Sequence, residues 1–130
     1  MLFSRSYAAR CLDSVRGRMD ARSIELYEGC EYFHDAYIEK IELSFSRRQS
    51  GRTDCDISLY QDVFSGMPKK LTLHMEGVKF FHLDQQKKFN FIGSAIYWLY
   101  MSDAGDNVEV RCSTDRLIEF TAVAEKVSIT

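Results

Sequence analysis

Apolar and polar residues alternate along much of the chain after residue 36, the pattern of β-strands with one buried and one solvent-facing side. The clearest example is residues 37–45, where Ile41, Leu43 and Phe45 point one way and the polar residues between them point the other. The same period of two predicts further strands at residues 55–60, 71–76, 78–83, 108–112, 118–122 and 127–129. We expect one interior to be shared by Ile41, Leu43, Phe45, Leu71, Leu73, Ile118 and Phe120.

Two stretches depart from simple alternation. Residues 89–101 are apolar on both faces, which suits a central strand, and a short helix over 94–101 stays open because a short apolar run has no diagnostic period. Gly77 interrupts the pattern between two predicted strands, which indicates a bulge or a bend. Exposed connections are expected at residues 46–54, 65–68, 84–88 and 102–107.

Before the strands, apolar residues follow a helical period. Leu12, Val15 and Met19 recur at helical spacing and predict a helix over about residues 7–19, with Ser4 or Ser6 as its cap. Residues 23–27 are ambiguous. The start of the chain is rich in Arg and Ser, as mitochondrial presequences are, but aspartates interrupt it, which favours an ordinary solvated helix.

These elements predict an α+β fold. The connections between strands are mostly too short for the dozen or more residues that a parallel crossover needs, so the sheet should be antiparallel. We therefore expect an N-terminal helix packed on a mostly antiparallel β-meander sheet. The 130 residues fit a single domain over 1–130, in which residues 1–22 form either a flexible segment or a separate helix.

Composition narrows the function classes. The formal net charge is -2, which argues against nucleic-acid binding because that needs dense Lys and Arg to displace counterions. No apolar run approaches the roughly 18 residues needed to span a bilayer. The four cysteines are widely spaced, without a CxxC pair, so we expect reduced, buried thiols in a cytoplasmic protein and neither a zinc site nor a cofactor. They are Cys11, Cys30, Cys55 and Cys112.

Histidines are the natural candidates for catalysis or metal binding. His34 and Asp35 form an HD pair, but no second HD pair follows, so the simpler interpretation is a turn before the first strand. His74 lies on the polar side of a predicted strand. A ligand or metal site that combines His74 with His34 and Asp35 is the alternative hypothesis. No GxSxG motif or Gly-rich phosphate loop is present.

Charge is unevenly spread. Residues 25–42 hold six acidic side chains against a single lysine, with aromatic residues interleaved. An acidic and aromatic segment of this kind can steer and anchor a basic protein partner, whereas the plainer interpretation is a solvated face whose aromatic residues belong to the core. The candidate binding residues are Glu25, Glu28, Glu31, His34, Asp35, Tyr37, Glu39, Glu42 and His74.

The run Tyr-Phe-His-Asp-Ala at 32–36, with the strand that follows it, resembles small bacterial proteins that open with an HD signature and continue as a β-meander. The segments Leu-Thr-Leu-His-Met-Glu-Gly-Val at 71–78 and Ile-Glu-Phe-Thr-Ala at 118–122 resemble later strands of those proteins. Some such families are immunity proteins of polymorphic toxin systems. The resemblance implies a non-catalytic cytosolic protein that binds a basic toxin domain.

Three functions therefore stay open. The first is a protein-binding module, the second an enzyme or small-ligand binder, and the third an assembly subunit whose exposed sheet face or edge strand pairs with a second copy. We rank them in that order.

Overall fold

The computed structural model describes residues 2–46, 51–85, 93–116 and 118–130. Its helices are α1 (Arg5–Asp13) and α2 (Ala21–Gly29), each followed by a short 3-10 turn, at Arg16–Arg18 and Glu31–Phe33. The strands are β1 (Tyr37–Ser46), β2 (Arg52–Tyr60), β3 (Lys70–Gln85), β4 (Ile96–Ala104), β5 (Asn107–Thr114) and β6 (Ile118–Ile129). No helix within the described ranges has the length and apolar character needed to cross a membrane.

Side-chain caps set the start of both helices. The Ser4 hydroxyl accepts from Tyr7 N (3.2 Å) at α1, and the Asp20 carboxylate accepts from Ser23 N (2.8 Å) at α2. The helix expected over 7–19 is thus present as α1, but it ends at Asp13 and continues only as a 3-10 turn. The ambiguous residues 23–27 belong to a second helix, which the pattern alone did not predict.

The sheet is antiparallel throughout, as expected, but it is not a simple meander. Its strand order is β1-β2-β3-β6-β5-β4, because β3 pairs with β6 and not with β4. Residues 94–101, left open between strand and helix, fall largely within β4, and this strand is the last of the sheet instead of a central one. Helix α1 packs against β4, which explains why β4 is apolar on both faces.

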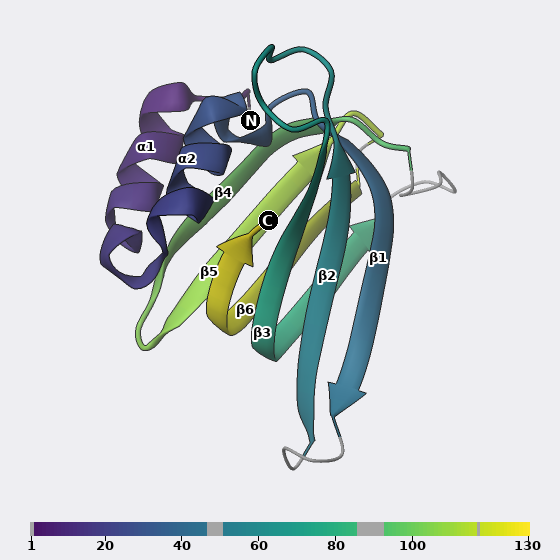
Figure 1. The fold of residues 1–130 in the computed structure, drawn as a ribbon. Coiled ribbons are helices and arrows are strands. Elements are labelled where there is room, and N and C mark those ends of the chain that lie inside the picture. The colour runs from purple at the N-terminus through teal and green to yellow at the C-terminus, as the bar shows by residue number, and fades with distance from the viewer. Residues whose placement is uncertain (1, 47–50, 86–92, 117) are drawn as a thin grey trace.

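The two outermost strands meet at one end of the sheet. Ile38 N donates to Ser94 O (3.0 Å) and Gly93 N donates to Ile38 O (2.7 Å). Two further bonds join Ile96 to the residues just before β1, from Ile96 N to Ala36 O (2.7 Å) and from Asp35 N to Ile96 O (2.9 Å). We call this junction the seam. The sheet therefore curls, and in Figure 1 the start of β1 and the segment leading into β4 lie together at the top.

A single hydrophobic core fills the inside of the curl, with residues from both helices and all six strands. The helices lie side by side along the β4 and β5 half of the sheet (Figure 1). Tyr27 is fully buried, and its hydroxyl donates to the Leu99 carbonyl oxygen. The Ser23 hydroxyl accepts from Ile129 N (2.8 Å), so α2 binds the backbone of β6 beyond the last residue that pairs with β5.

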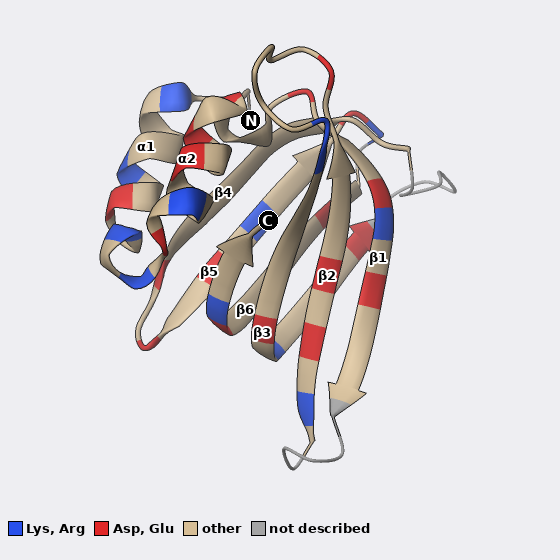
Figure 2. Ribbon diagram, viewed as in Figure 1, with Lys and Arg blue, Asp and Glu red and all other residues tan. Residues whose placement is uncertain are grey.

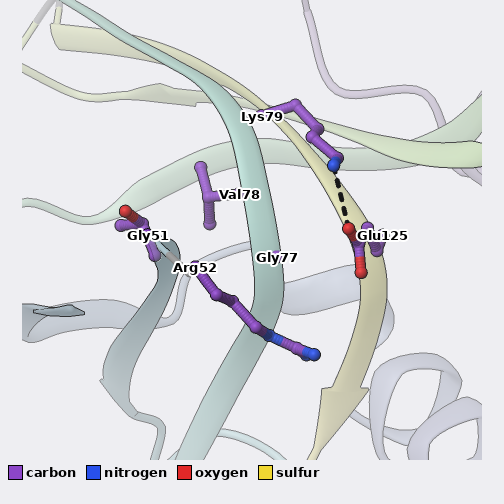
Figure 3. A pocket seen from close by; sticks show the side chains of 7 residues that line it. Gly51, Arg52, Gly77, Val78, Lys79 and Glu125 are labelled. Atoms are coloured by element: carbon purple, nitrogen blue, oxygen red, sulfur yellow. Dashed lines mark ion pairs between the residues drawn. The ribbon is translucent and has the colours of Figure 1, made fainter. Parts of the chain in front are cut away.

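The long strand β3 bends in its middle, where Gly77 has a positive φ of 63°. The register with β6 shifts between Val78 and Phe80, so the expected bulge near Gly77 is confirmed, and one strand covers both predicted segments. Strand β6 likewise joins the strands expected at 118–122 and 127–129. A cavity of about 520 Å³ opens at the bend, with Lys79 and Glu125 paired beside it at 2.9 Å (Figure 3).

The bend leaves β1 and β2 extending beyond the rest of the sheet as a two-stranded arm (Figure 1). Pairing between β2 and β3 stops at Cys55 and Met75, so the residues of β2 before Cys55 have no partner in β3. Leu43 and Phe45 lie on this arm and are 59% and 67% exposed. Their predicted place in the shared interior is therefore wrong. The other expected core residues are buried, apart from Ile41, which is half-buried.

The expected turns at 65–68 and 102–107 fall between strands, although β4 runs on to Ala104 and shortens the second. The connection expected at 46–54 is too long, because Ser46 belongs to β1 and residues 52–54 belong to β2, while residues 47–50 lie outside the described residues. Of the polar turn expected at 84–88, residues 86–88 also lie outside the described residues, and β3 itself reaches Gln85.

Removal of the hydrogen bond between Tyr27 and Leu99 tests how strongly α2 is held on the sheet. Tyr27→Phe removes the hydroxyl and leaves a carbonyl oxygen without its buried donor, so we expect a loss of about 1–2 kcal/mol in the free energy of unfolding. Chemical denaturation followed by circular dichroism measures it. Tyr37→Phe, at a side chain that is 43% exposed, is the control and should change the stability by less than about 0.5 kcal/mol.

Candidate functional site

A groove lies beside the seam, at the start of β1. It has a volume of about 530 Å³ and is lined by Tyr37, Ile38, Glu39, Tyr60, Lys70 and Gly93. A second hollow of about 360 Å³ adjoins it and shares Glu39 and Lys70 with it. We call the first hollow the seam groove. It contains two phenol rings, one carboxylate and one ammonium group.

A β-bulge places Glu39 in this groove. The register between β1 and β2 moves from Ile38 opposite Leu59 to Lys40 opposite Ser58, which leaves Glu39 without a partner in β2. A bulge changes the direction of the extra side chain relative to a regular strand. Tyr37, which precedes the bulge, lies opposite Tyr60. Glu39 is exposed and forms no ion pair with any described residue.

The turn that leads into the groove has an unusual backbone. Glu31, Tyr32, Phe33 and Asp35 all have φ between 50° and 72°, the left-handed region that side chains with a Cβ rarely adopt. Each such residue costs on the order of 1 kcal/mol, which the surrounding packing must offset. Phe33 is fully buried below the turn. We call residues 31–35 the left-handed corner.

His34 belongs to the same corner and is held on two sides. Its ring stacks on Phe3 with centroids 4.3 Å apart. Its Nδ1 lies 2.6 Å from the Tyr97 carbonyl oxygen, and because a carbonyl only accepts, Nδ1 carries the proton. Its Nε2 lies 3.5 Å from the Asp35 carboxylate. These contacts fit the expected role of the HD pair as part of a turn before the first strand.

The acidic segment is less available to a basic partner than the sequence suggests. Three of its glutamates pair with arginines from the first 22 residues of the chain. The pairs are Glu25 with Arg22 (2.9 Å), Glu28 with Arg16 (3.3 Å) and Glu31 with Arg5 (2.6 Å). Figure 2 shows basic and acidic residues interspersed along α1 and α2. Exposed pairs of this kind add little stability, but they neutralise the charge that a basic partner would meet.

Glu42 and His74 lie apart from the groove, on the outer face of the sheet. Glu42 is opposite Asp56, and Asp56 is opposite His74. Lys40 pairs with Glu42 at 2.8 Å and lowers the pKa of that carboxyl. His74 Nδ1 lies 2.8 Å from the Asp56 carboxylate and Nε2 lies 2.8 Å from the Thr130 hydroxyl, so both ring nitrogens have partners.

The structure does not bring His34, Asp35 and His74 together. His34 contacts β4, whereas His74 contacts β2 and the end of the chain. In the ranges that the structure describes, no three His, Cys, Asp or Glu side chains lie close enough together to hold a metal ion. The alternative hypothesis of a metal site on these three residues therefore has no geometric support.

Each expected site residue can now be placed. Tyr37 and Glu39 line the seam groove, and Glu31, His34 and Asp35 belong to the corner before it. The remaining four residues are engaged elsewhere on the surface. Sequence reasoning missed Tyr60, Lys70 and Gly93, because the register between β1 and β2 and the seam bring them to Tyr37 from distant parts of the chain.

A second carboxylate has a structural role at the bend of β3. Asp54 Oδ1 accepts from Gly77 N (2.9 Å) and from Arg52 Nε (3.2 Å). The pKa of Asp54 is lowered, first by the hydrogen bond from Gly77 and further by Arg52. This carboxylate fixes the point where the arm departs from the rest of the sheet.

The fold and the groove together define an α+β protein with a curled, six-stranded antiparallel sheet and a shallow surface site at its seam. No known family model matches the chain, and no curated protein matches it. The fold is similar to the crystal structure of an uncharacterized protein from Neisseria gonorrhoeae. That likeness has a TM-score of 0.52 at 17% identity and covers 75% of this chain and 91% of that one. At this identity the likeness concerns the fold alone.

Acidification tests the role of Asp54. A carboxyl whose folded pKa is lowered stabilises the protein above its unfolded pKa of about 3.9, and this contribution is lost as pH falls through the folded pKa. Asp54→Asn should lower the free energy of unfolding at pH 7 by about 0.5–1 kcal/mol and reduce its decline between pH 5 and pH 2. Urea denaturation across this range measures both. Asp106→Asn, in an exposed turn, should leave the pH profile unchanged.

The burial of the cysteines leads to a separate prediction. All four are free and buried. Burial raises the pKa of the Cys55 thiol to about 11 and also raises those of Cys30 and Cys112. Because the thiolate is the reactive form, native protein should react with a thiol reagent at pH 8 far more slowly than protein unfolded in guanidinium. A fast-reacting thiol in the native protein would contradict the burial.

Proposed function

We propose that this protein is a non-catalytic module that binds another protein through the seam groove. The proposal depends above all on Glu39, an exposed carboxylate without a described ion-pair partner that a bulge places beside Tyr37 and Tyr60. Tyrosine is enriched among the residues that dominate protein interfaces, because its ring buries area at a low entropic cost. A partner's Arg or Lys fits such a place, with the carboxylate as counter-ion and a phenol ring for its cation.

Two further observations support the same surface. The groove is shallow and largely open, which suits an inserted side chain better than a buried substrate. The left-handed corner, which precedes the groove in the chain, has a strained backbone because its left-handed residues are not glycines. Strain of this kind clusters at functional sites. Lys70, which lies on β3 and lines the same groove, supplies a cation for a carbonyl or carboxylate of the partner.

The finer assignment follows from the resemblance to immunity proteins. It makes a basic toxin domain the partner class that we propose, in a cytoplasmic setting where the four free cysteines stay reduced. Lys or Arg side chains on such a domain would complement Glu39, whereas Glu25, Glu28 and Glu31 already have arginine partners within the chain.

The test compares Glu39→Lys with Glu25→Lys, two substitutions that each replace a carboxylate by an ammonium group. Tagged wild-type protein is used to recover partners from the source organism, and binding of a recovered partner is then measured by calorimetry. Glu39→Lys should weaken that binding at least tenfold, because it places a cation where the partner's cation would sit. Tyr37→Ala should weaken it without changing its dependence on salt.

Glu25→Lys is the matched control, since Glu25 lies on α2 and away from the groove. It should leave the affinity within about twofold of wild type. Equal losses for Glu39→Lys and Glu25→Lys would show a non-specific charge effect and would contradict a site at the seam. A partner that binds Glu39→Lys as tightly as wild type would contradict it as well.

A further inference from the structure

The outer edge of β1 is only partly occupied. Up to the bulge at Glu39, the strand has neighbours on both sides, because Ile38 exchanges backbone hydrogen bonds with Gly93 and Ser94. From Lys40 to the end of the strand, β2 lies on one side. On the other side, no strand among the described residues pairs with β1. We call residues 40–46 the open edge.

The open edge carries the most exposed large apolar side chains of the sheet. Leu43 and Phe45 are 59% and 67% exposed and lie on the inner row of the arm with Ile41, which is half-buried. An unpaired strand edge is a template for another strand, and proteins usually protect it with prolines or with charges on the edge. The open edge has no proline, and its charges, on Lys40 and Glu42, already pair with each other.

Symmetry decides which strand fits this edge. Within the described part of the chain, seven residues of β1 are open on this side, and their centre is Leu43. When two copies pair antiparallel about Leu43, all seven residues find partners, with Leu43 opposite Leu43 and Ile41 opposite Phe45 on the inner row. On the outer row Glu42 comes opposite Ser44, so no like charges face each other directly.

Other registers are poorer. A shift by one residue places apolar residues opposite polar ones, because side chains alternate between faces. Pairing about Glu42 uses five residues and places two Glu42 carboxylates opposite each other, which is destabilising. Pairing about Ile41 uses three residues, since the next positions meet the part of β1 that already binds Gly93 and Ser94. Pairing about Ser44 also uses five and leaves Ile41 without a partner.

We infer that the protein forms a symmetric homodimer in which two β1 strands pair antiparallel at the open edge, centred on Leu43. The two six-stranded sheets then become one continuous sheet. The inner rows of both arms join, so that Leu43 and Phe45 of each copy are covered by the other. None of the residues 40–46 that form this interface lines the seam groove.

The first test is the mass of the protein in solution. Light scattering after size exclusion, over a concentration series from low to high micromolar, should show the mass rising towards twice the monomer mass. Leu43→Lys should lower the dimer affinity at least tenfold, because it places two cations opposite each other at the centre. Circular dichroism checks that this exposed substitution leaves the fold unchanged. A wild-type mass that stays monomeric throughout the series would overturn the proposal.

The second test fixes the register. In the Leu43→Cys variant the new thiols of two copies come opposite each other, and the four native cysteines are buried and should not compete. Mild oxidation, or a short bismaleimide, should link this variant into a covalent dimer. Phe45→Cys is the matched control, since its thiol faces Ile41 of the other copy and lies four positions from its own equivalent. The combined Ile41→Cys and Phe45→Cys variant should link again.

Equal linking of Leu43→Cys and Phe45→Cys would contradict pairing about Leu43. So would a dimer of wild-type mass that persists unchanged in Leu43→Lys, because that dimer would use another surface. Neither result depends on the partner at the seam groove. Conversely, Glu39→Lys should leave the dimer mass unaffected, so the two proposals succeed or fail separately.

Discussion

Much of this structure depends on the backbone hydrogen bonds of the seam. They join residues 35–38 to residues 93–96, two segments far apart in the chain, and so bring the outermost strands of the sheet together. The curl that results gives six strands a common inside, in which one core can be buried without a second sheet. The same junction places Gly93 next to Tyr37 and forms the groove. It also occupies the first part of the β1 edge, so the part of this edge that has no partner among the described residues begins at Lys40.

The second constraint is the bend of β3 at Gly77. A strand of 16 residues would otherwise carry β1 and β2 along its whole length. Because β3 turns away after Met75, its second half pairs with β6, and the tips of β1 and β2 continue without a further described strand beside them. Asp54 stabilises this separation by binding Gly77 N across the gap. The exposure of Leu43 and Phe45 is therefore a consequence of sheet geometry and not of an unusual local sequence.

Alternation predicted the strands and most of the core, because a period of two directly reflects which side of a strand is buried. The antiparallel direction of the sheet followed from the short connections between the strands. Alternation failed for Leu43 and Phe45, since it indicates a face and says nothing of whether another layer covers that face. Alternation also contains no information on strand order, and the pairing of β3 with β6 joins residues that are distant in the chain. The bulge that places Glu39 in the groove has no glycine to mark it. The ion pairs of the acidic segment were not predicted, because its counter-ions, Arg5, Arg16 and Arg22, come from an earlier part of the chain.

The left-handed corner has a consequence for how firmly a ligand can be held. A loop of glycines can reach the same backbone angles, but it samples many others and must give up that freedom when a ligand binds. In the corner, four residues with a Cβ hold those angles, and the buried packing around Phe33 keeps them there before any encounter. The turn that precedes the groove is thus preorganised, and a ligand that contacts this turn orders little additional backbone on association. A small contact area can then give a larger share of its interaction energy as affinity.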